Sequence, residues 1–109
     1  MTYLRIWKFR PAPGREDAFA AAYGPDGAWP ALFGKADGYL GTELYRPDRP
    51  GGWWLTIDRW ASAEGFERFG AQFGAEYRAL DARLEGVAGD EQFVGAFGSG
   101  PAEGHMDDT

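Results

Sequence analysis

Residues 53–84 read WWLTIDRWASAEGFERFGAQFGAEYRALDARL, and they join two patterns of different period. Residues 53–60 are rich in aromatic and β-branched side chains, which indicates a strand. Ser62 then supplies a suitable helix N-cap, with Glu64 in the first turn, where the helix dipole favours an acid. Beyond the cap an apolar stripe recurs at helical spacing, formed by Phe66, Phe69, Phe73, Tyr77, Leu80 and Leu84. A strand leading directly into a long amphipathic helix is therefore the clearest element pair in the chain.

Three further segments have the composition of strands. Each is short, rich in aromatic or branched residues, and bounded by Gly or Pro; they are residues 3–9, 39–46 and 91–97. The loop at 47–52 has hairpin length, so the two strands that it joins should be antiparallel.

The remaining segments complete one small domain. Residues 15–23 carry a helical stripe, whereas residues 28–33 form either a short helix or an irregular segment. The order β-α-β-β-α-β predicts an α+β, ferredoxin-like domain over residues 1–97, with a four-stranded antiparallel sheet and both helices on one face. Residues 98–109 are small, polar and acidic, and we expect them to form a disordered tail.

Composition excludes several classes of function. The chain of 109 residues has a formal net charge of −6 and no basic stripe, which argues against binding to nucleic acid. No apolar run is long enough to span a membrane, and the first residues lack a signal-peptide layout, so we expect a cytoplasmic protein. With no Cys, no Asn and a single His, His105, in the expected tail, the sequence predicts no metal site and no cofactor.

Both faces of the predicted sheet are apolar. Trp53, Leu55 and Ile57 point to one side of their strand, and Trp54 and Trp60 point to the other. A sheet with one solvated face should show polar residues on that face. We therefore expect a second copy of the chain to cover it in a homodimer.

The chain resembles the antibiotic biosynthesis monooxygenase-like family of dimeric α+β barrel proteins. The resemblance covers about residues 3–97 and depends on the run at 56–66, on Phe69, Tyr77, Leu80 and Asp81, and on residues 93–97. It implies a ferredoxin-like domain that forms a dimeric α+β barrel, with a pocket between each sheet and its own helices. The family includes cofactor-independent monooxygenases of aromatic polyketides, heme-degrading enzymes and isomerases.

The heme-degrading branch of that family does not fit this sequence. That branch uses an Asn on the first strand and a Trp and a His on the long helix, where this chain has Trp7, Phe69 and Tyr77 in the approximately corresponding positions. Without a His in the body of the domain there is no axial imidazole for heme.

Three polar side chains are candidate catalytic residues: Tyr77, Arg5 and Asp58. Tyr77 could donate a hydrogen bond to a substrate oxygen, or it could be a core Tyr bonded to the backbone. Arg5 could hold an enolate or phenolate and Asp58 could act as a base, or the two could simply pair across adjacent strands. For Asp81 a solvated or interface ion pair is the simpler reading. The candidate substrate-binding residues are aromatic: Trp7, Phe69, Phe73, Trp54 and Trp60.

The leading hypothesis is a cofactor-free monooxygenase that oxidises a small polyketide-, anthrone- or quinol-type aromatic with O2. The substrate carbanion would supply the electrons that reduce O2. The protein would orient the substrate and stabilise the negative charge that forms on it. Two alternatives stay open: a non-catalytic ligand-binding or dimerisation domain, and a cyclase or isomerase that uses the shape of the pocket and an acid. An open cavity with Tyr77 or Arg5 directed inward would favour binding or catalysis.

Overall fold

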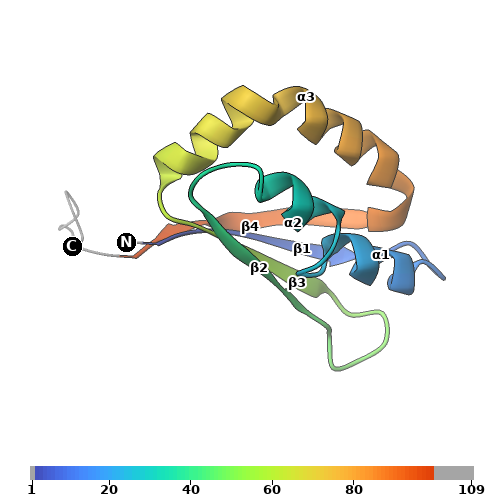
Figure 1. Ribbon diagram of the computed structural model, residues 1–109. Helices are drawn as coiled ribbons and strands as arrows, with labels where there is room; N and C mark the ends of the chain where they lie inside the picture. Colours follow the sequence, from blue (N-terminus) through green and yellow to red (C-terminus); the bar gives the residue numbers. More distant parts are fainter. Residues whose placement is uncertain (1, 100–109) are drawn as a thin grey trace.

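The computed structural model describes residues 2–99. Within them the elements are β1 (Tyr3–Arg10), α1 (Glu16–Tyr23), α2 (Ala28–Phe33), β2 (Tyr39–Tyr45), β3 (Trp54–Trp60), α3 (Ala63–Ala88) and β4 (Asp90–Gly98). The strands form one antiparallel sheet in the order β2-β3-β1-β4, and α3 arches above it (Figure 1). The predicted α+β, ferredoxin-like fold is confirmed, and residues 28–33 are helical.

The register of the sheet decides which side chains face the helices. β1 lies between β3 and β4, with Arg5 opposite Asp58 and Trp7 opposite Thr56. Because side chains alternate along a strand, the odd-numbered residues of β1 and the even-numbered residues of β3 share the helix-covered face. At one end of this face Phe9 and Trp54 are buried beneath α1.

The long helix α3 is capped as expected and is bent. The Ser62 hydroxyl accepts a hydrogen bond from the backbone N–H of Gly65 at 3.0 Å. At Phe73 the backbone leaves the helical region, with φ −119° and ψ 22°, and two helical segments meet there. The bend lets α3 pass over the sheet as an arch (Figure 1), so that its later turns reach down toward β1 and β4.

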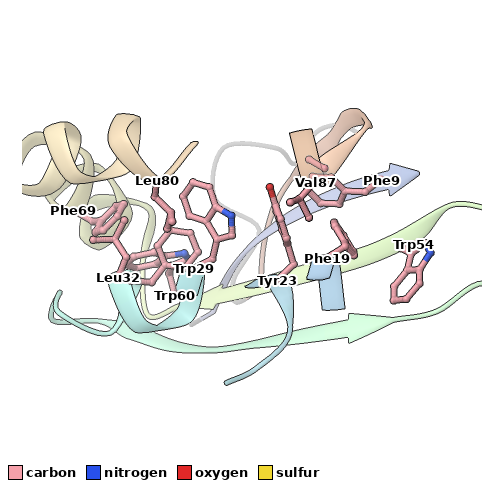
Figure 2. Packing of buried hydrophobic residues seen from close by; sticks show 12 residues of the cluster. Phe9, Phe19, Tyr23, Trp29, Leu32, Trp54, Trp60, Phe69, Leu80 and Val87 are labelled. Atoms are coloured by element: carbon pink, nitrogen blue, oxygen red, sulfur yellow. The ribbon is translucent and has the colours of Figure 1, made fainter. Parts of the chain in front are cut away.

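The core is built mainly from aromatic rings. Trp60, Phe19 and Phe69 are its largest fully buried side chains, and they come from β3, α1 and α3 respectively. Figure 2 shows this core as a row of rings between the helices and the sheet. Neighbouring rings meet mostly at tilted or edge-to-face angles, as for Phe33 and Trp60 at 5.6 Å.

A tight connection places β4 beside β1. Gly89 follows α3 with a positive φ of 65°, and a Cβ at this position would overlap the carbonyl oxygen of Arg10. Only glycine combines this backbone conformation with so close an approach of two chain segments. The turn thereby sets Glu91 directly opposite Phe9 in the sheet.

The other face of the sheet is largely apolar, and no helix among residues 2–99 covers it (Figure 1). Its central residues, Leu4, Ile6, Leu55 and Ile57, are only partly buried. Around them lie exposed apolar side chains, including Tyr45 at 49% and Phe97 at 49% exposed. An ion pair of 2.8 Å between Arg59 and Glu43 crosses the same face.

β4 continues through Gly98, the first residue of the segment expected to be a tail. The N–H of Ser99 donates a hydrogen bond of 2.8 Å to the carbonyl oxygen of Thr2. The rest of that segment, residues 100–109 with His105, lies outside the described residues.

Candidate functional site: an aromatic cavity with carboxylates

A cavity lies between the helix-covered face of the sheet and all three helices. It encloses about 450 Å³ of space between the side chains, counted out to its opening to solvent, of which about 50 Å³ is accessible to water. The interior is therefore narrow. The lining residues are Trp7, Phe9, Tyr23, Trp29, Phe33, Thr56, Asp58, Tyr77, Asp81 and Glu91.

The walls of the cavity are a chain of contacting rings. The Phe9 ring lies 4.9 Å from that of Tyr23, and the Trp29 ring lies 6.0 Å from Tyr23 and 4.9 Å from Tyr77. These four rings come from β1, α1, α2 and α3. The short helix α2 thus contributes directly to the cavity wall, because its Trp29 indole packs between Tyr23 of α1 and Tyr77 of α3.

Asp58 is the carboxylate on the sheet side of the cavity. It accepts a hydrogen bond of 2.7 Å from the Thr42 hydroxyl, which is bonded in turn to the Tyr39 hydroxyl. Burial raises the pKa of Asp58 to about 6, against the lowering effects of the Thr42 hydrogen bond and of the nearby Arg5 charge. A carboxylate of this pKa is ionised at neutral pH and can still accept a proton readily.

Tyr77 faces Asp58 from the helix side of the cavity. Its side chain is half-buried, and within the part of the chain that the structure describes its hydroxyl makes no side-chain hydrogen bond. Burial, followed by the charge of Asp81, raises the pKa of Tyr77. The hydroxyl is therefore a neutral donor available to a ligand.

The Tyr23 hydroxyl and the Trp29 indole N–H are two further polar groups in the cavity wall. Burial, together with the charges of Glu91 and Asp81, raises the pKa of Tyr23 to about 12. The Trp29 indole nitrogen is turned toward the Tyr23 hydroxyl (Figure 2), and its N–H acts to lower that pKa. The contact falls short of hydrogen-bond geometry, so Trp29 Nε1 is a buried donor without a partner among residues 2–99.

Arg5 lies behind the cavity wall and does not line it. Its guanidinium carbon lies 4.1 Å from the centre of the Phe66 ring and 4.6 Å from that of Phe93. Although Arg5 stands opposite Asp58 in the register, the two side chains form no ion pair. Its charge still reaches the site, because it lowers the pKa of both Asp58 and Tyr77.

The candidate aromatic residues divide into two groups. Trp7 lines the cavity, with its ring 5.0 Å from that of Phe93. Phe69 and Trp60 are fully buried in the core beside it, and Phe73 stacks on Phe69 at the bend of α3. Trp54 lies at the far end of the sheet, against Phe19 and beneath the Arg46 guanidinium. These four residues support the wall and do not line it.

Sequence reasoning did not single out the other lining residues as a site. Tyr23 belongs to an expected helical stripe. Trp29 lies in a segment for which the sequence allowed either a short helix or an irregular structure. Glu91 is adjacent to the cavity only because β4 pairs with β1 in this register. The one available signal was Asp81, which falls one helical turn after Tyr77 on the same face of α3.

The described residues contain no group of three His, Cys, Asp or Glu side chains that could hold a metal ion. No helix among them is long and apolar enough to cross a bilayer. The chemistry available at the site is therefore that of carboxylates, phenols, an indole N–H and aromatic faces.

A ferredoxin-like domain with a cavity between its sheet and its helices defines a class of small α+β proteins. Within that class, the family model described as antibiotic biosynthesis monooxygenase matches residues 2–80. The chain belongs to this family.

Solved structures share the fold at low sequence identity. SnoaB from Streptomyces nogalater, a cofactor-independent oxygenase, is 21% identical with a TM-score of 0.58, over 94% of this chain and 95% of that one. A protein from Bordetella bronchiseptica named for the same family is 20% identical with a TM-score of 0.66, over 92% and 98%. Rv0793 from Mycobacterium tuberculosis is 18% identical with a TM-score of 0.59, over 94% and 99%. No curated protein matches this chain.

Proposed function

We propose that this protein is a cofactor-independent monooxygenase that oxidises a small aromatic substrate of the anthrone, phenol or quinol type. The observation that carries the proposal is a narrow cavity with aromatic walls, open to solvent, that contains a carboxylate with a pKa of about 6. Membership of the monooxygenase family and the fold shared with the oxygenase SnoaB support it.

The lining residues divide the work. Trp7, Trp29 and Phe9 hold the ring of the substrate between their faces. Asp58 is the base that removes a proton from the reacting carbon or oxygen, since its pKa is close to neutral. Tyr77 donates its hydroxyl proton as a hydrogen bond to the substrate oxygen on which negative charge collects.

Arg5 acts at a distance. Its guanidinium is occupied by two aromatic faces and does not reach the cavity, but its positive charge favours ionised Asp58 and so keeps the base available. We regard it as a positioning and electrostatic residue.

For a substrate of the anthrone type, which carries an activated CH2 group, the reaction balances with O2 as the oxidant. Asp58 takes one proton from an activated CH2 group, and the resulting carbanion reduces O2 and forms a C–O bond, giving a hydroperoxide after protonation. Loss of the second C–H proton then breaks the O–O bond, so that a C=O group forms and hydroxide leaves as water. In total CH2 and O2 become C=O and H2O, with the four electrons supplied by the carbon.

The test is oxygen uptake by the purified, metal-stripped protein with a panel of anthrones and hydroquinones. We expect uptake above the spontaneous rate, reduced on the order of 100-fold by Asp58→Asn, since a positioned base is worth at least about that much. Tyr77→Phe should reduce it by on the order of tenfold, and the exposed Asp37→Asn should leave it unchanged. Uptake equal to the spontaneous rate with every compound would refute the monooxygenase.

The second candidate is a non-catalytic domain that binds a small molecule. The aromatic walls support this candidate as well, because they can hold a ring whether or not Asp58 acts as a base. Ligand-dependent quenching of Trp fluorescence without oxygen uptake would select this candidate.

We further propose that the protein works as a homodimer in the cytoplasm. The apolar sheet face with Ile6, Leu55, Ile57, Tyr45 and Phe97 supports the dimer, because a second copy would remove it from water. The absence of Cys fits a reducing compartment.

A further inference from the structure

Hydrogen-bonded side chains connect the cavity to a second hollow in the surface. Asp58 lines the cavity and accepts a hydrogen bond of 2.7 Å from the Thr42 hydroxyl, which is bonded in turn to the Tyr39 hydroxyl. Thr42 and Tyr39 line the second hollow and not the cavity. Of the residues that the structure describes, none lines both spaces, so this chain of hydroxyls is the link between them.

The second hollow lies at the edge of the sheet, between β2 and the segment that leads into α2. Tyr39, Gly41 and Thr42 line it from the strand, and the turn at 25–27 and residues 30–31 of α2 line it from the other side. It encloses about 670 Å³ of space counted out to solvent, of which about 390 Å³ is accessible to water. Water therefore has ample room beside Tyr39 and Thr42, whereas only about 50 Å³ of the cavity beside Asp58 is accessible to water.

A bulge in the edge strand puts both hydroxyls on the side of the helices. Tyr39 and Thr42 stand three residues apart on β2, whereas their partners on β3 stand two apart, and Leu40 is the extra residue. In a regular strand side chains alternate, so residues 39 and 42 would point to opposite faces. Bulges re-aim side chains in this way and are frequent next to active sites. The bulge in β2 thus creates the hydroxyl chain behind Asp58.

The hydroxyl protons of this chain point toward the carboxylate. An ionised carboxylate only accepts hydrogen bonds, so Thr42 donates its single hydroxyl proton to Asp58. With that proton used, Thr42 can only accept from Tyr39, and Tyr39 is the donor of the outer bond. When Asp58 is protonated the direction can reverse, so that each group donates to the next one outward and Tyr39 donates to water.

The proposed reaction gives such a chain a use. The CH2 group of an anthrone loses two protons in turn, so Asp58 has to be ionised again while the substrate is still bound. A ring in the narrow cavity displaces the water that could otherwise carry the first proton away. The hydroxyls stay in place behind Asp58, because neither Thr42 nor Tyr39 lines the cavity.

We propose that Thr42 and Tyr39 form a proton relay that connects Asp58 to the water in the second hollow while a substrate fills the cavity. The proton on Asp58 passes to the Thr42 oxygen as the Thr42 proton passes to Tyr39 and the Tyr39 proton to water. Every O–H bond that breaks is replaced by one that forms, and no electrons are transferred. This inference rests on the proposed function for the role of Asp58 as the base, and Thr42 and Tyr39 are positioning residues that act through it.

Deuterium exchange in the absence of oxygen tests the relay. In anaerobic D2O no oxidation takes place, and Asp58 exchanges the CH2 protons of anthrone when it removes a proton, passes it to solvent and returns a deuteron. NMR spectra of anthrone and its hydroxylated forms measure the rate of this exchange with the cavity occupied. We expect the natural protein to accelerate the exchange above the spontaneous rate.

Variants of the hydroxyls assign the exchange to the relay. Tyr39→Phe should slow it by on the order of tenfold, less than the roughly 100-fold for loss of a base, because some water still reaches Asp58 through the opening of the cavity. Thr42→Val should slow it at least as much, and Thr42→Ser, which keeps a hydroxyl, should restore it. Tyr45→Phe removes a hydroxyl from an exposed position of the same strand and should leave the rate unchanged.

The titration of Asp58, followed by NMR of its carboxyl carbon, separates a relay from a structural role. Tyr39→Phe should leave the pKa of Asp58 near 6, because the hydrogen bond from Thr42 remains. Thr42→Val should raise that pKa, since it removes a hydrogen bond that favours the ionised form. Neither variant alters the other charged and titratable groups around the cavity, which are Arg5, Tyr23, Tyr77, Asp81 and Glu91.

The outcomes separate this inference from the proposed reaction. Slower exchange in Tyr39→Phe with an unchanged pKa of Asp58, and exchange in Thr42→Ser as fast as in the natural protein, would support the relay even if no compound drives oxygen uptake. The relay is overturned if Tyr39→Phe exchanges as fast as the natural protein, or if its slower exchange comes with a shifted pKa of Asp58. It is also overturned if the natural protein does not accelerate exchange, whether or not oxygen uptake is found.

Discussion

Replacing Asp58 by Asn should stabilise the protein, and the gain should depend on pH. The folded protein raises the pKa of Asp58 from its ordinary value of 3.8 to about 6, mainly through burial. Between these values the folded state holds a proton that the unfolded state has released. The stability of the natural protein therefore falls as pH rises through this range, and the loss is complete above the folded pKa.

The size of the effect follows from the two pKa values. Their difference of about 2 corresponds to roughly 3 kcal/mol, since one pKa unit is worth about 1.4 kcal/mol. Asn keeps the shape of the side chain and an oxygen that can accept the Thr42 hydrogen bond, but it carries no charge. The variant should gain close to nothing at pH 3 and up to about 3 kcal/mol at pH 8.

Urea unfolding at a fixed protein concentration measures this gain. A stabilisation of roughly 3 kcal/mol moves the midpoint by about 1–3 M at pH 8. Asp37→Asn, at an exposed position, should unfold like the natural protein at both pH values. The reasoning would be refuted if Asp58→Asn lowered the urea midpoint at pH 8, or raised it equally at pH 3 and pH 8. Either result would mean that the ionised Asp58 carboxylate does not destabilise the folded protein.

Further predictions concern the turn, the sheet face and the reaction. Gly89→Ala should cost at least about 2 kcal/mol in urea unfolding, because it adds a backbone clash to a positive φ, whereas Gly14→Ala, with φ 78° and open space around it, should cost only about 1 kcal/mol. Ile57→Glu should turn a dimer into a folded monomer by light scattering, since it places a charge on the apolar sheet face; an unchanged mass would contradict that interface. The rate of oxygen uptake should rise with pH up to a plateau above about 6, as Asp58 loses its proton; a rate that falls over this range would exclude Asp58 as the base.

The sequence predicted the fold well because its signals are local. The step of three and four residues along Phe66, Phe69 and Phe73, with the cap at Ser62, defined α3 before any tertiary contact was known. The bend at Phe73 carried no such signal: the apolar stripe continues through it in register, and only the flanking Gly70 and Gly74 weaken the helix there. The arch of α3, and with it the space beneath, could not be read from periodicity.

The site was predictable only in part, because it depends on contacts between segments that are far apart in the sequence. Tyr77, Asp58 and Trp7 come together because adjacent strands and the helix above them fall into place once the topology is known. Tyr23 and Trp29 reach the cavity because two short helices pack against α3, and this depends on tertiary packing of rings. Sequence alone distinguishes poorly between an aromatic side chain in a core and one in a wall, because both are apolar and both recur at helical or strand spacing.

The carboxylates give the strongest reason to regard the cavity as a binding site. Burial raises the pKa of Asp58 and of Glu91, so each ionised form is less favourable in the folded protein than in the unfolded chain. Asn and Gln have nearly the same shape and would remove that cost, which the Arg5 charge offsets only in part for Asp58. A fold that retains such groups in the wall of a cavity is locally unfavourable in a way that a bound ligand would correct. The same groups that destabilise the empty protein would thus be the ones that define what it binds.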